Sequence, residues 1–356
     1  MRGQRPGTIM LTTTIGAYPK PPAVPIRDWF GQPGGPDTAE PTAGYAETLA
    51  AHAATIERVL DEATVAVVAE QVALGIDIPT DGEIRRENYI HYHCRHLRGI
   101  DFATLTEQQT RGNYQVLLPT ITRPIEAGPG FLVRDWRVAQ SATRRPVKIT
   151  VPGPLTIGDR VADEHYHDPR LRGAALADAL NVEIRRLADA GCPAIQVDEP
   201  VFARKVEDAL AFGIDHLERC FHKVPPSTER LVHICCGYPD RIDAEDYPKA
   251  PQSAYLDLAP ALDEARIDAV SIEDAHRPNE LGLLELFART KVLLGVIAIA
   301  RSRLEPAEEI RVRLQAAQGH IDPARLVAAP DCGLGFLGPA LTRDKLRALT
   351  SAAHSL

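Results

Sequence analysis

Four side chains that could bind a transition metal fall at the ends of three apolar segments in the second half of the chain. His233 and Cys235 close one segment, and Glu273 and Cys332 each close a later one. In a β-strand, residues at i and i+2 point to the same side, so His233 and Cys235 can converge on one point. An imidazole, two thiolates and a carboxylate suit Zn²⁺, which prefers tetrahedral sites and is soft enough for sulfur. The sequence therefore predicts a zinc site at these four residues.

The composition of this ligand set indicates which chemistry the metal would support. Hydrolytic zinc usually has histidine and carboxylate ligands, which leave the metal electrophilic enough to ionise water. Two thiolates and a carboxylate outweigh the charge of Zn²⁺ and make it a weaker Lewis acid. Such a metal still deprotonates an incoming thiol, because coordinated thiols lose their proton. We therefore expect a thiol substrate that is activated for attack on an alkyl carbon.

Eight short apolar segments, separated by helical patterns, would position these residues. Strands that alternate with helices pair in parallel through crossovers, and eight such units predict an α/β fold, the (β/α)8 TIM barrel. Barrel enzymes place their catalytic groups at the C-terminal ends of the strands. An open doubly wound sheet shows the same alternation and is the alternative fold. The predicted strands are Met10–Tyr18, Ile76–Glu83, Val147–Gly153, Ala194–Pro200, Arg230–Cys236, Ala269–Asp274, Lys291–Ala298 and Arg325–Cys332.

We expect one catalytic barrel over residues 1–356, with two segments outside the repeat. Residues 21–44 form a loop rich in Pro and Gly after the first strand, and residues 86–146 form a long insertion after the second. Both follow strand C-termini and are predicted to lie over the active-site face. The insertion contains the histidine-rich run His91–His96, a second candidate metal cluster. Because no other predicted element offers it partners, we interpret these histidines as exposed or packed side chains that could close over a substrate.

Composition and charge exclude several classes of partner. The chain has 356 residues, a net charge of −8 and no basic block, so nucleic acid is not an expected partner. No apolar run reaches the ~18 residues of a membrane span, and the N-terminus lacks the apolar centre of a signal peptide, so we expect a cytoplasmic protein without a membrane partner. Six cysteines are too few for a disulfide scaffold in a chain of this length. The sequence leaves a homo-oligomer open.

Seven motifs in this chain are similar to those of a known family. They are TTTIGAYPK, DGE, VPGPLTIG, IQVDEP, HICCG, SIED and APDCG, in chain order. They resemble, in the same order and on the same strands, the C-terminal catalytic barrel of the cobalamin-independent methionine synthases. The resemblance extends from about Thr12 to the C-terminus. Without a second, N-terminal barrel, the chain resembles the short single-barrel branch, which includes archaeal-type methionine synthases and zinc-dependent alkyl-thiol transferases.

The resemblance implies a role for each matching residue. The four predicted metal ligands match the family's zinc ligands. Glu83 and Asp198 match the acids that hold the amino group of homocysteine, and Ile15-Gly16 match the strand end whose backbone meets its carboxylate. Carboxylates at a barrel mouth can orient an ammonium through charge-assisted hydrogen bonds. The alternative for Glu83 is a salt bridge to Arg85 or Arg86, and for Asp198 a backbone hydrogen bond. The resemblance thus implies a zinc-dependent methyltransferase of methionine biosynthesis that accepts homocysteine or a similar thiol.

Departures from the family pattern bear on the alkyl donor. Ala17 stands where the methionine synthases have Ser, and Ala298 and Ala300 stand where they have an Asp and a His that handle a proton. Arg160 replaces a Trp that stacks on the folate donor. Alanine cannot donate a proton, arginine is a poor acid, and a general acid contributes roughly 10²–10⁴ in rate. We therefore predict a donor other than folate, such as a sulfonium, a methyl-corrinoid protein or another electrophile.

Three other functions remain as alternatives. A zinc-dependent transferase could add the thiol to an epoxide or related electrophile. A metal-free barrel similar to uroporphyrinogen decarboxylase would not need His233, Cys235 and Cys332 together. A non-catalytic zinc-binding barrel would more commonly use closely spaced Cys and His ligands, whereas the predicted ones are widely separated and include a carboxylate.

Overall fold

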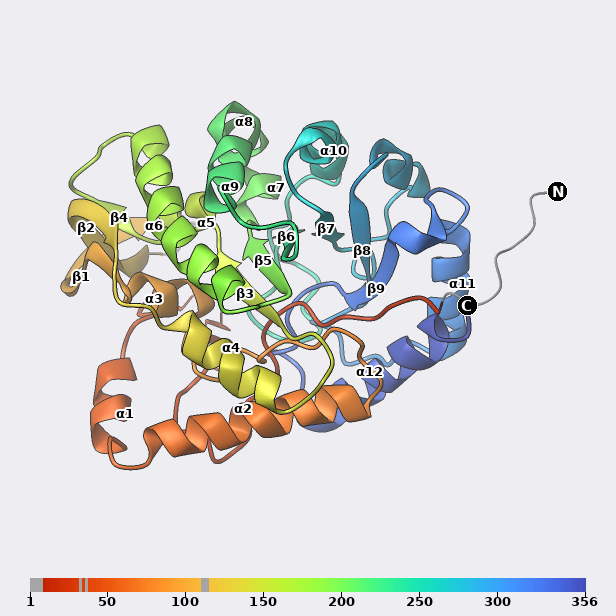
Figure 1. Cartoon of the computed structure of the whole chain (residues 1–356), viewed down its shortest axis with the longest axis horizontal. Coiled ribbons are helices and arrows are strands. Elements are labelled where there is room, and N and C mark those ends of the chain that lie inside the picture. Colours follow the sequence, from red (N-terminus) through yellow and green to blue (C-terminus); the bar gives the residue numbers. More distant parts are fainter. Residues whose placement is uncertain (1–8, 32–33, 36–37, 110–114) are drawn as a thin grey trace.

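The computed structural model describes residues 9–31, 34–35, 38–109 and 115–356, and its centre is a parallel sheet. Six strands form this sheet in the order β3-β5-β6-β7-β8-β9, each hydrogen-bonded in parallel to the next. Helices surround these strands (Figure 1). The strands are β3 (Lys148–Pro152), β5 (Ala194–Asp198), β6 (Glu229–Ile234), β7 (Ala269–Ile272), β8 (Lys291–Ile297) and β9 (Leu326–Pro330). They fall within the last six segments predicted from the sequence, save for Glu229.

The first two predicted strands close the sheet into a (β/α)8 barrel through isolated bridges. Pro79 has no N–H to donate, and the Asp77 carboxylate accepts hydrogen bonds from Thr12 N and Oγ1, both at 2.9 Å. Side-chain bonds therefore take the place of a regular ladder here. The prediction of a barrel is confirmed, although these two segments are not continuous strands. The parallel bridges are Thr12 to Ala328, Thr13 to Ile78, and Thr80 to Lys148.

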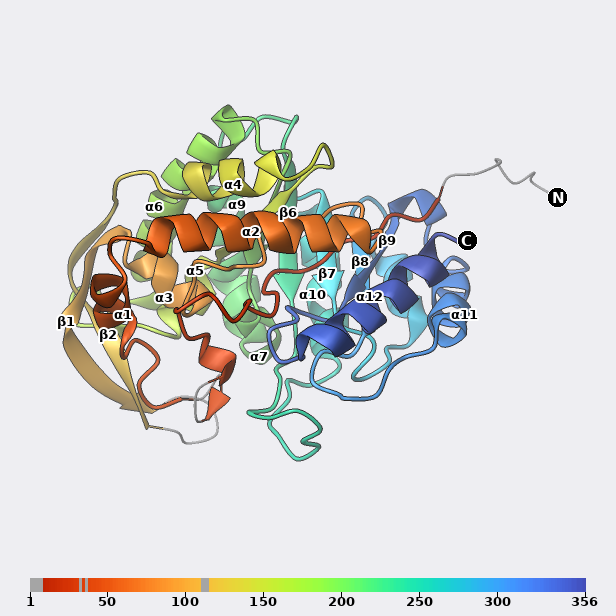
Figure 2. The ribbon, with the colours of Figure 1, turned by 90° about the horizontal axis from the view of Figure 1, so that it is seen from below.

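Helices follow most of the strands and cover the outside of the barrel. Asp168 shows why one of them begins where it does: its side chain accepts hydrogen bonds from Arg170 N and Leu171 N at the start of α6. Thr350 in α12 donates to Leu74 O, at the end of α2, which places these helices side by side (Figure 2). The α-helices are α1 (Tyr45–Ala51), α2 (Ile56–Ala73), α3 (Tyr89–Cys94), α4 (Leu132–Ser141), α5 (Pro154–Gly158), α6 (Pro169–Asp189), α7 (Val201–Arg204), α8 (Val206–Asp208), α9 (Ile214–Cys220), α10 (Ala254–Glu264), α11 (Ala307–Ala317) and α12 (Pro339–Ala353).

Short helical turns complete the secondary structure. The 3-10 helices are η1 (Trp29–Gly31), η5 (Leu281–Leu286) and η6 (Pro323–Arg325), and η4 (Ala209–Gly213) is a π-helix.

The bore of the barrel has a small apolar core of its own. Alternate residues of a strand point to the same side, so each strand sends every second side chain inward. The inner cluster is separate from the larger core between the sheet and the helices. Its members are Ile15, Ala194, Leu231, Ala269, Leu293, Val327 and Ala329. Gln196 on β5 and His233 on β6 lie two residues beyond Ala194 and Leu231 and therefore also point into the bore. The apolar cluster is thus followed by polar side chains closer to the pocket.

The insertion at 86–146 contains two helices and an antiparallel hairpin. Strands β1 (Leu97–Gln109) and β2 (Gln115–Ala127) pair with each other, and β4 (Ala162–Asp163) adds to β2 in parallel. The hairpin lies at one end of the molecule, opposite α11 and α12, in both ribbon views (Figures 1 and 2). Helix α3, which precedes the hairpin, is the part of the insertion that approaches the barrel mouth.

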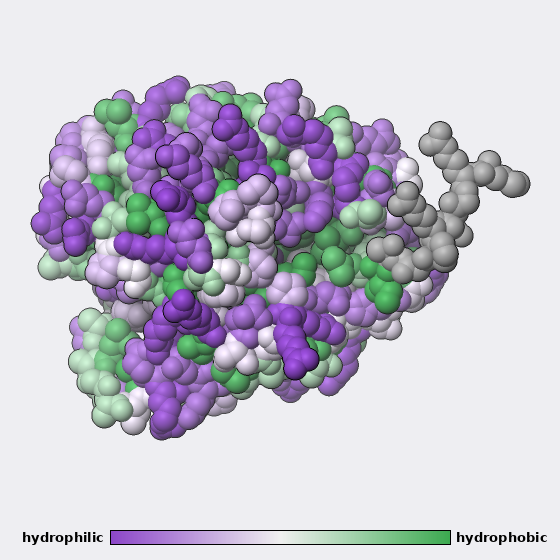
Figure 3. Space-filling model, in the orientation of Figure 1, coloured by the Kyte–Doolittle hydropathy of each residue, from purple (hydrophilic) through white to green (hydrophobic). Residues whose placement is uncertain are grey.

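The surface is mixed in character. On the face shown in Figure 3, hydrophilic side chains predominate and hydrophobic ones form small areas between them. None of the helices in the described part of the chain is long and apolar enough to cross a membrane.

Gly295→Ala should destabilise the barrel, because neighbouring atoms occupy the space that a side chain at this position would need. A Cβ at Gly295 would lie 2.3 Å from Asp331 Oδ1 and 2.7 Å from Asp331 Cα. Overpacking of this kind costs about 1–3 kcal/mol. We expect a loss of that size in the free energy of unfolding, measured with urea. The control is Gly282→Ala in η5, where nothing lies within 4 Å of the added Cβ. Equal stability of the two variants would contradict the tight fit.

Candidate metal centre and its pocket

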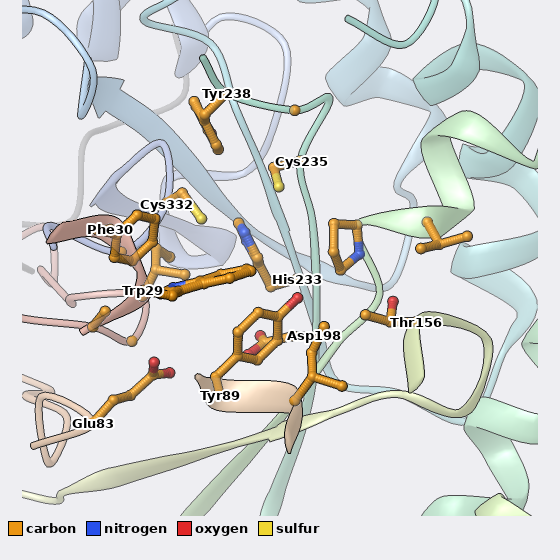
Figure 4. A pocket seen from close by; sticks show the side chains of 18 of the residues that line it. Trp29, Phe30, Glu83, Tyr89, Thr156, Asp198, His233, Cys235, Tyr238 and Cys332 are labelled. Atoms are coloured by element: carbon orange, nitrogen blue, oxygen red, sulfur yellow. The ribbon is translucent and has the colours of Figure 1, made fainter. Parts of the chain in front are cut away.

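One pocket at the C-terminal ends of the strands collects most of the predicted site residues (Figure 4). It encloses about 840 Å³ of empty space, including its open mouth. Seven of the eight residues predicted to bind metal or substrate line it. They are Ile15, Gly16, Glu83, Asp198, His233, Cys235 and Cys332.

His233, Cys235 and Cys332 form a compact group in this pocket. A ring nitrogen of His233 and the two Sγ atoms all lie within 4.8 Å of one another. The Nδ1 atom of His233 lies 2.9 Å from Ser271 Oγ, whereas its Nε2 is buried without a hydrogen-bond partner. A buried polar atom without a partner calls for an explanation, and a metal ligand commonly has its other ring nitrogen held in this way. The donor set and its spacing therefore fit a tetrahedral zinc ion.

Glu273 is not part of this group in the structure. One of its carboxylate oxygens pairs with Lys249 Nζ, and the other accepts a hydrogen bond from Cys236 N at 3.0 Å. The side chain of Glu273 is buried and that of Lys249 is 15% exposed, so the ion pair lies at the edge of the interior. The carboxylate would have to exchange Lys249 for the metal to become a fourth ligand.

Glu83, predicted as the last residue of the second strand, lies in a turn and faces the pocket. Its backbone has φ 55°, a left-handed conformation that is uncommon outside glycine. Its Oε1 accepts hydrogen bonds from Thr150 Oγ1 at 2.8 Å and Arg86 Nη1 at 3.3 Å. A Cβ on Gly16 would lie 2.6 Å from the same oxygen, so Gly16 makes room for it. Burial raises the pKa of Glu83 to about 7, although Arg86 opposes the shift.

Asp198 ends β5, which pairs with the strand that carries Thr150, and its position is set from within the barrel. Its Oδ1 accepts a hydrogen bond from Gln196 Nε2 at 2.6 Å, and the same amide donates to Ile15 O at 3.0 Å. Burial raises the pKa of Asp198 to about 6, against the effect of His233. Two carboxyl groups therefore face one pocket with pKa values near neutrality. An arriving ammonium would favour their ionised forms.

Aromatic rings that the sequence interpretation did not single out form another wall of the pocket. The centroid of the Trp29 ring lies 5.2 Å from that of Phe30 and 5.6 Å from that of Tyr89. In the view of Figure 4, the Trp29 ring lies between Glu83 and Cys332, and the Tyr89 ring is drawn in front of Asp198. Trp29 and Phe30 come from the loop predicted to cover the active-site face. Two aromatic residues within a loop rich in Pro and Gly were the sequence feature that could have identified them as pocket residues.

The departures from the family pattern lie in two places. Arg160 and Ala17 line the same pocket as the proposed metal ligands. Ala298 and Ala300 are buried after β8. An imidazole lies next to Ala300, because Ala300 N donates to His276 Nε2 at 3.1 Å.

The histidine-rich run in the insertion does not form a metal cluster. His91 and His93 lie in helix α3, where His91 Nε2 is 2.9 Å from Arg160 O and His93 Nδ1 is 2.7 Å from Tyr89 O. The ring of His96 stacks on Phe131 at 3.8 Å. Burial lowers the pKa of His91 to about 4. These side chains are packed and neutral, as the interpretation of the run as packing predicted.

Comparisons with known proteins give a consistent result. Residues 10–355 match the family model described as the catalytic domain of cobalamin-independent synthase. Methionine synthases of Sulfolobus acidocaldarius and Saccharolobus solfataricus are 27% and 25% identical to the chain; each match covers 95% of this chain, and 90% and 92% of those proteins. A solved structure of a B12-independent methionine synthase from Shewanella sp. W3-18-1, in complex with selenomethionine, has a TM-score of 0.82 and 29% identity over 97% of both chains.

Glu83→Gln should flatten the pH dependence of stability between about pH 4.5 and 7. Burial raises the pKa of Glu83 from 4.5 to about 7, so in this range the unfolded chain releases a proton that the folded chain keeps. Stability contributed by protonated Glu83 is complete below pH 4.5 and is lost as the pH rises through 7, by up to about 3 kcal/mol. Urea unfolding on both sides of this range measures the loss.

The control for this experiment is Glu264→Gln, because Glu264 is an exposed carboxyl group on α10. It should keep the wild-type dependence on pH. A Glu83→Gln variant with the same slope as wild type would show that Glu83 titrates normally.

Proposed function

The chain belongs to the family of cobalamin-independent methionine synthase catalytic domains, and on this premise we propose that it is a zinc-dependent methyltransferase for homocysteine or a similar amino thiol. Methyl transfer to a thiol is the activity of this family. The observation that carries the zinc dependence is the group formed by His233, Cys235 and Cys332, with a buried His233 Nε2 that has no hydrogen-bond partner. We take the described barrel as one catalytic unit, with residues 86–146 as an insertion at its mouth.

The three grouped residues would hold the metal, with Glu273 as the proposed fourth ligand. When bound, zinc would lower the pKa of a thiol that reaches it, and so make a nucleophile available near neutral pH. Ser271 holds the His233 ring through Nδ1 and leaves Nε2 without a hydrogen-bond partner, available to a metal. When a substrate thiol occupies the fourth coordination position of the metal, the Glu273 carboxylate would instead pair with Lys249.

The walls of the pocket suit the amino-acid part of such a thiol. Glu83 and Asp198 would accept hydrogen bonds from its ammonium, and the backbone at Ile15-Gly16 would meet its carboxylate. Charge-assisted hydrogen bonds of this type are about twice as strong as neutral ones. Selenomethionine, the ligand of the Shewanella relative, differs from methionine only in its selenium atom. A methylated amino-acid thiol is therefore a product that this pocket could accommodate.

The donor we propose is one whose leaving group departs without a proton, such as a sulfonium or a methyl-corrinoid. Ala298 and Ala300 cannot protonate a folate nitrogen. The imidazole beside Ala300 does not replace them, because His276 Nδ1 pairs with Asp331 Oδ2 at 2.6 Å and Nε2 accepts from Ala300 N. Transfer from a sulfonium releases a neutral thioether, which needs no acid. Opening of an epoxide leaves an alkoxide, which does, so methylation is the better-supported reaction.

Cys332→Ser should lose zinc and thiol methylation together, because serine is a poor ligand for this soft site. We expect substoichiometric zinc by elemental analysis and a rate lower by roughly a hundredfold or more, since even outer residues of metal sites contribute 10–100-fold. The matched control is Cys236→Ser. Cys236 is buried one residue from Cys235 but outside the metal group, so this variant should keep its zinc. Full zinc and activity in Cys332→Ser would refute the ligand assignment.

Wild-type protein should not convert homocysteine with a methyl-folate at the roughly 1–10³ s⁻¹ of ordinary enzymes. Ala300→His alone should not restore that activity, because Arg160 still occupies the place of the aromatic platform. The assay is methionine formation with methyl-folate, a methylsulfonium and a methyl-corrinoid offered in parallel. Efficient turnover of the folate by the unmodified protein would overturn the proposal about the donor.

A further inference from the structure

A fully buried lysine lies inside the barrel beneath the pocket. Lys148 is on β3 and is 0% exposed, and its Nζ donates a hydrogen bond to Gln196 Oε1 at 2.6 Å. Gln196 is on the neighbouring strand β5 and is also 0% exposed. Neither residue lines the pocket, so neither would touch a substrate. Burial lowers the pKa of Lys148 to about 7, because the ammonium loses its water.

The contacts of Gln196 allow only one orientation of its amide. Its NH₂ group has two hydrogens, and both are taken by groups that can only accept: Ile15 O at 3.0 Å and Asp198 Oδ1 at 2.6 Å. Its carbonyl oxygen faces Lys148, and an ammonium can only donate. A flipped amide would point its oxygen at a carbonyl and a carboxylate, and its hydrogens at a cation. Lys148 therefore acts together with Ile15 O and Asp198 to fix which end of the amide reaches the pocket.

Both acceptors held by Gln196 belong to the part of the pocket that suits an amino acid. Asp198 is the wall acid proposed for the ammonium, and Ile15 precedes Gly16 at the strand end proposed for the carboxylate. We propose that Lys148 and Gln196 are positioning residues that set the preference of this pocket for an α-amino thiol. The inference rests on the proposed function and adds to it the residues responsible for substrate selectivity.

A role in stability alone is a poor explanation for Lys148. Removing an ammonium from water is costly, and Lys148→Met would remove that cost. The same change would leave the buried Gln196 Oε1 without its donor, which opposes the gain. Lys148 has one hydrogen bond in the structure to offset that cost. A positioning role predicts that Lys148→Met loses selectivity for the amino thiol, whatever its effect on the free energy of unfolding. A structural role alone predicts a loss of stability with unchanged selectivity.

The experiment measures the binding of two thiols to zinc-loaded protein by calorimetry. Homocysteine has the α-amino group, and its desamino analogue has the same thiol and carboxylate without it. In Lys148→Met, we expect homocysteine to bind about tenfold more weakly, the range for one hydrogen bond to a charged group. Affinity for the desamino analogue should change little, so the ratio between the two thiols should fall.

The matched control is Lys345→Met, which removes another buried lysine of the same barrel. Lys345 Nζ donates to Ala298 O at 3.0 Å and Glu305 Oε2 at 2.6 Å, away from the pocket. This variant should keep the wild-type ratio between the two thiols, whatever its effect on the free energy of unfolding.

A double-mutant cycle tests whether Lys148 acts through Gln196. Gln196→Leu alone should lower the preference for homocysteine, because it removes the donor to Asp198. In that background, Lys148→Met should cause no further loss, since residues in one network are not additive. Additive losses would overturn the inference, as would a Lys148→Met variant that keeps the wild-type ratio.

The proposed function can fail separately in the same experiment. Wild-type protein that does not prefer homocysteine to its desamino analogue overturns the assignment of the amino thiol, and the inference with it. Wild-type protein that has the preference, together with an unchanged Lys148→Met, overturns the inference alone.

Discussion

The pocket depends on the period of two in parallel strands that close into a barrel. Every second side chain of a strand points into the bore, so each strand places its residues in layers. On β5 the inward series is Ala194, Gln196 and Asp198, and on β6 it runs from Leu231 to His233. The lowest layer is apolar, the next provides hydrogen bonds, and the highest faces the pocket. If the register of a strand shifted by one residue, its functional side chain would point away from the bore, into the core between the sheet and the helices.

This layering places many polar groups where water does not reach them. Such groups destabilise a fold unless they have partners, so the interior of the barrel is organised as a hydrogen-bonded network. Arg86, Thr150 and Glu83 form one part of it, and Lys148, Gln196 and Asp198 form another. Each part ends in a carboxylate at the pocket wall. His233 Nε2 has no hydrogen-bond partner, but one ring nitrogen of His91, of His93 and of His216 also lacks one. What sets His233 apart is the pair of thiols, Cys235 and Cys332, whose Sγ atoms lie within 4.8 Å of its ring nitrogen.

The sequence predicted the parts of the site that lie on strands and missed those that depend on loops. Spacing at i and i+2 was enough to bring His233 and Cys235 together, because strand geometry leaves little freedom. The ion pair between Glu273 and Lys249 could not be predicted, since Lys249 lies in a segment without regular structure between β6 and α10. Trp29 was missed for a similar reason: the direction of a loop side chain depends on tertiary contacts. For the fold, the eight segments were evident from hydrophobicity, but the bridges that replace two of the strands depend on side chains such as Asp77.

The aromatic wall has a consequence for how proteins of this architecture can diverge. Trp29 and Phe30 belong to the loop after the first strand and Tyr89 to the segment after the second, whereas the thiols and the imidazole lie at the ends of strands fixed by backbone hydrogen bonds. Loops tolerate changes in length and sequence that strands do not. The residues at the strand ends and the loop residues that shape the pocket entrance can therefore change independently in evolution. A lineage could therefore change the shape of the entrance through changes in these two loops, while the strand ends that carry His233, Cys235 and Cys332 stay the same.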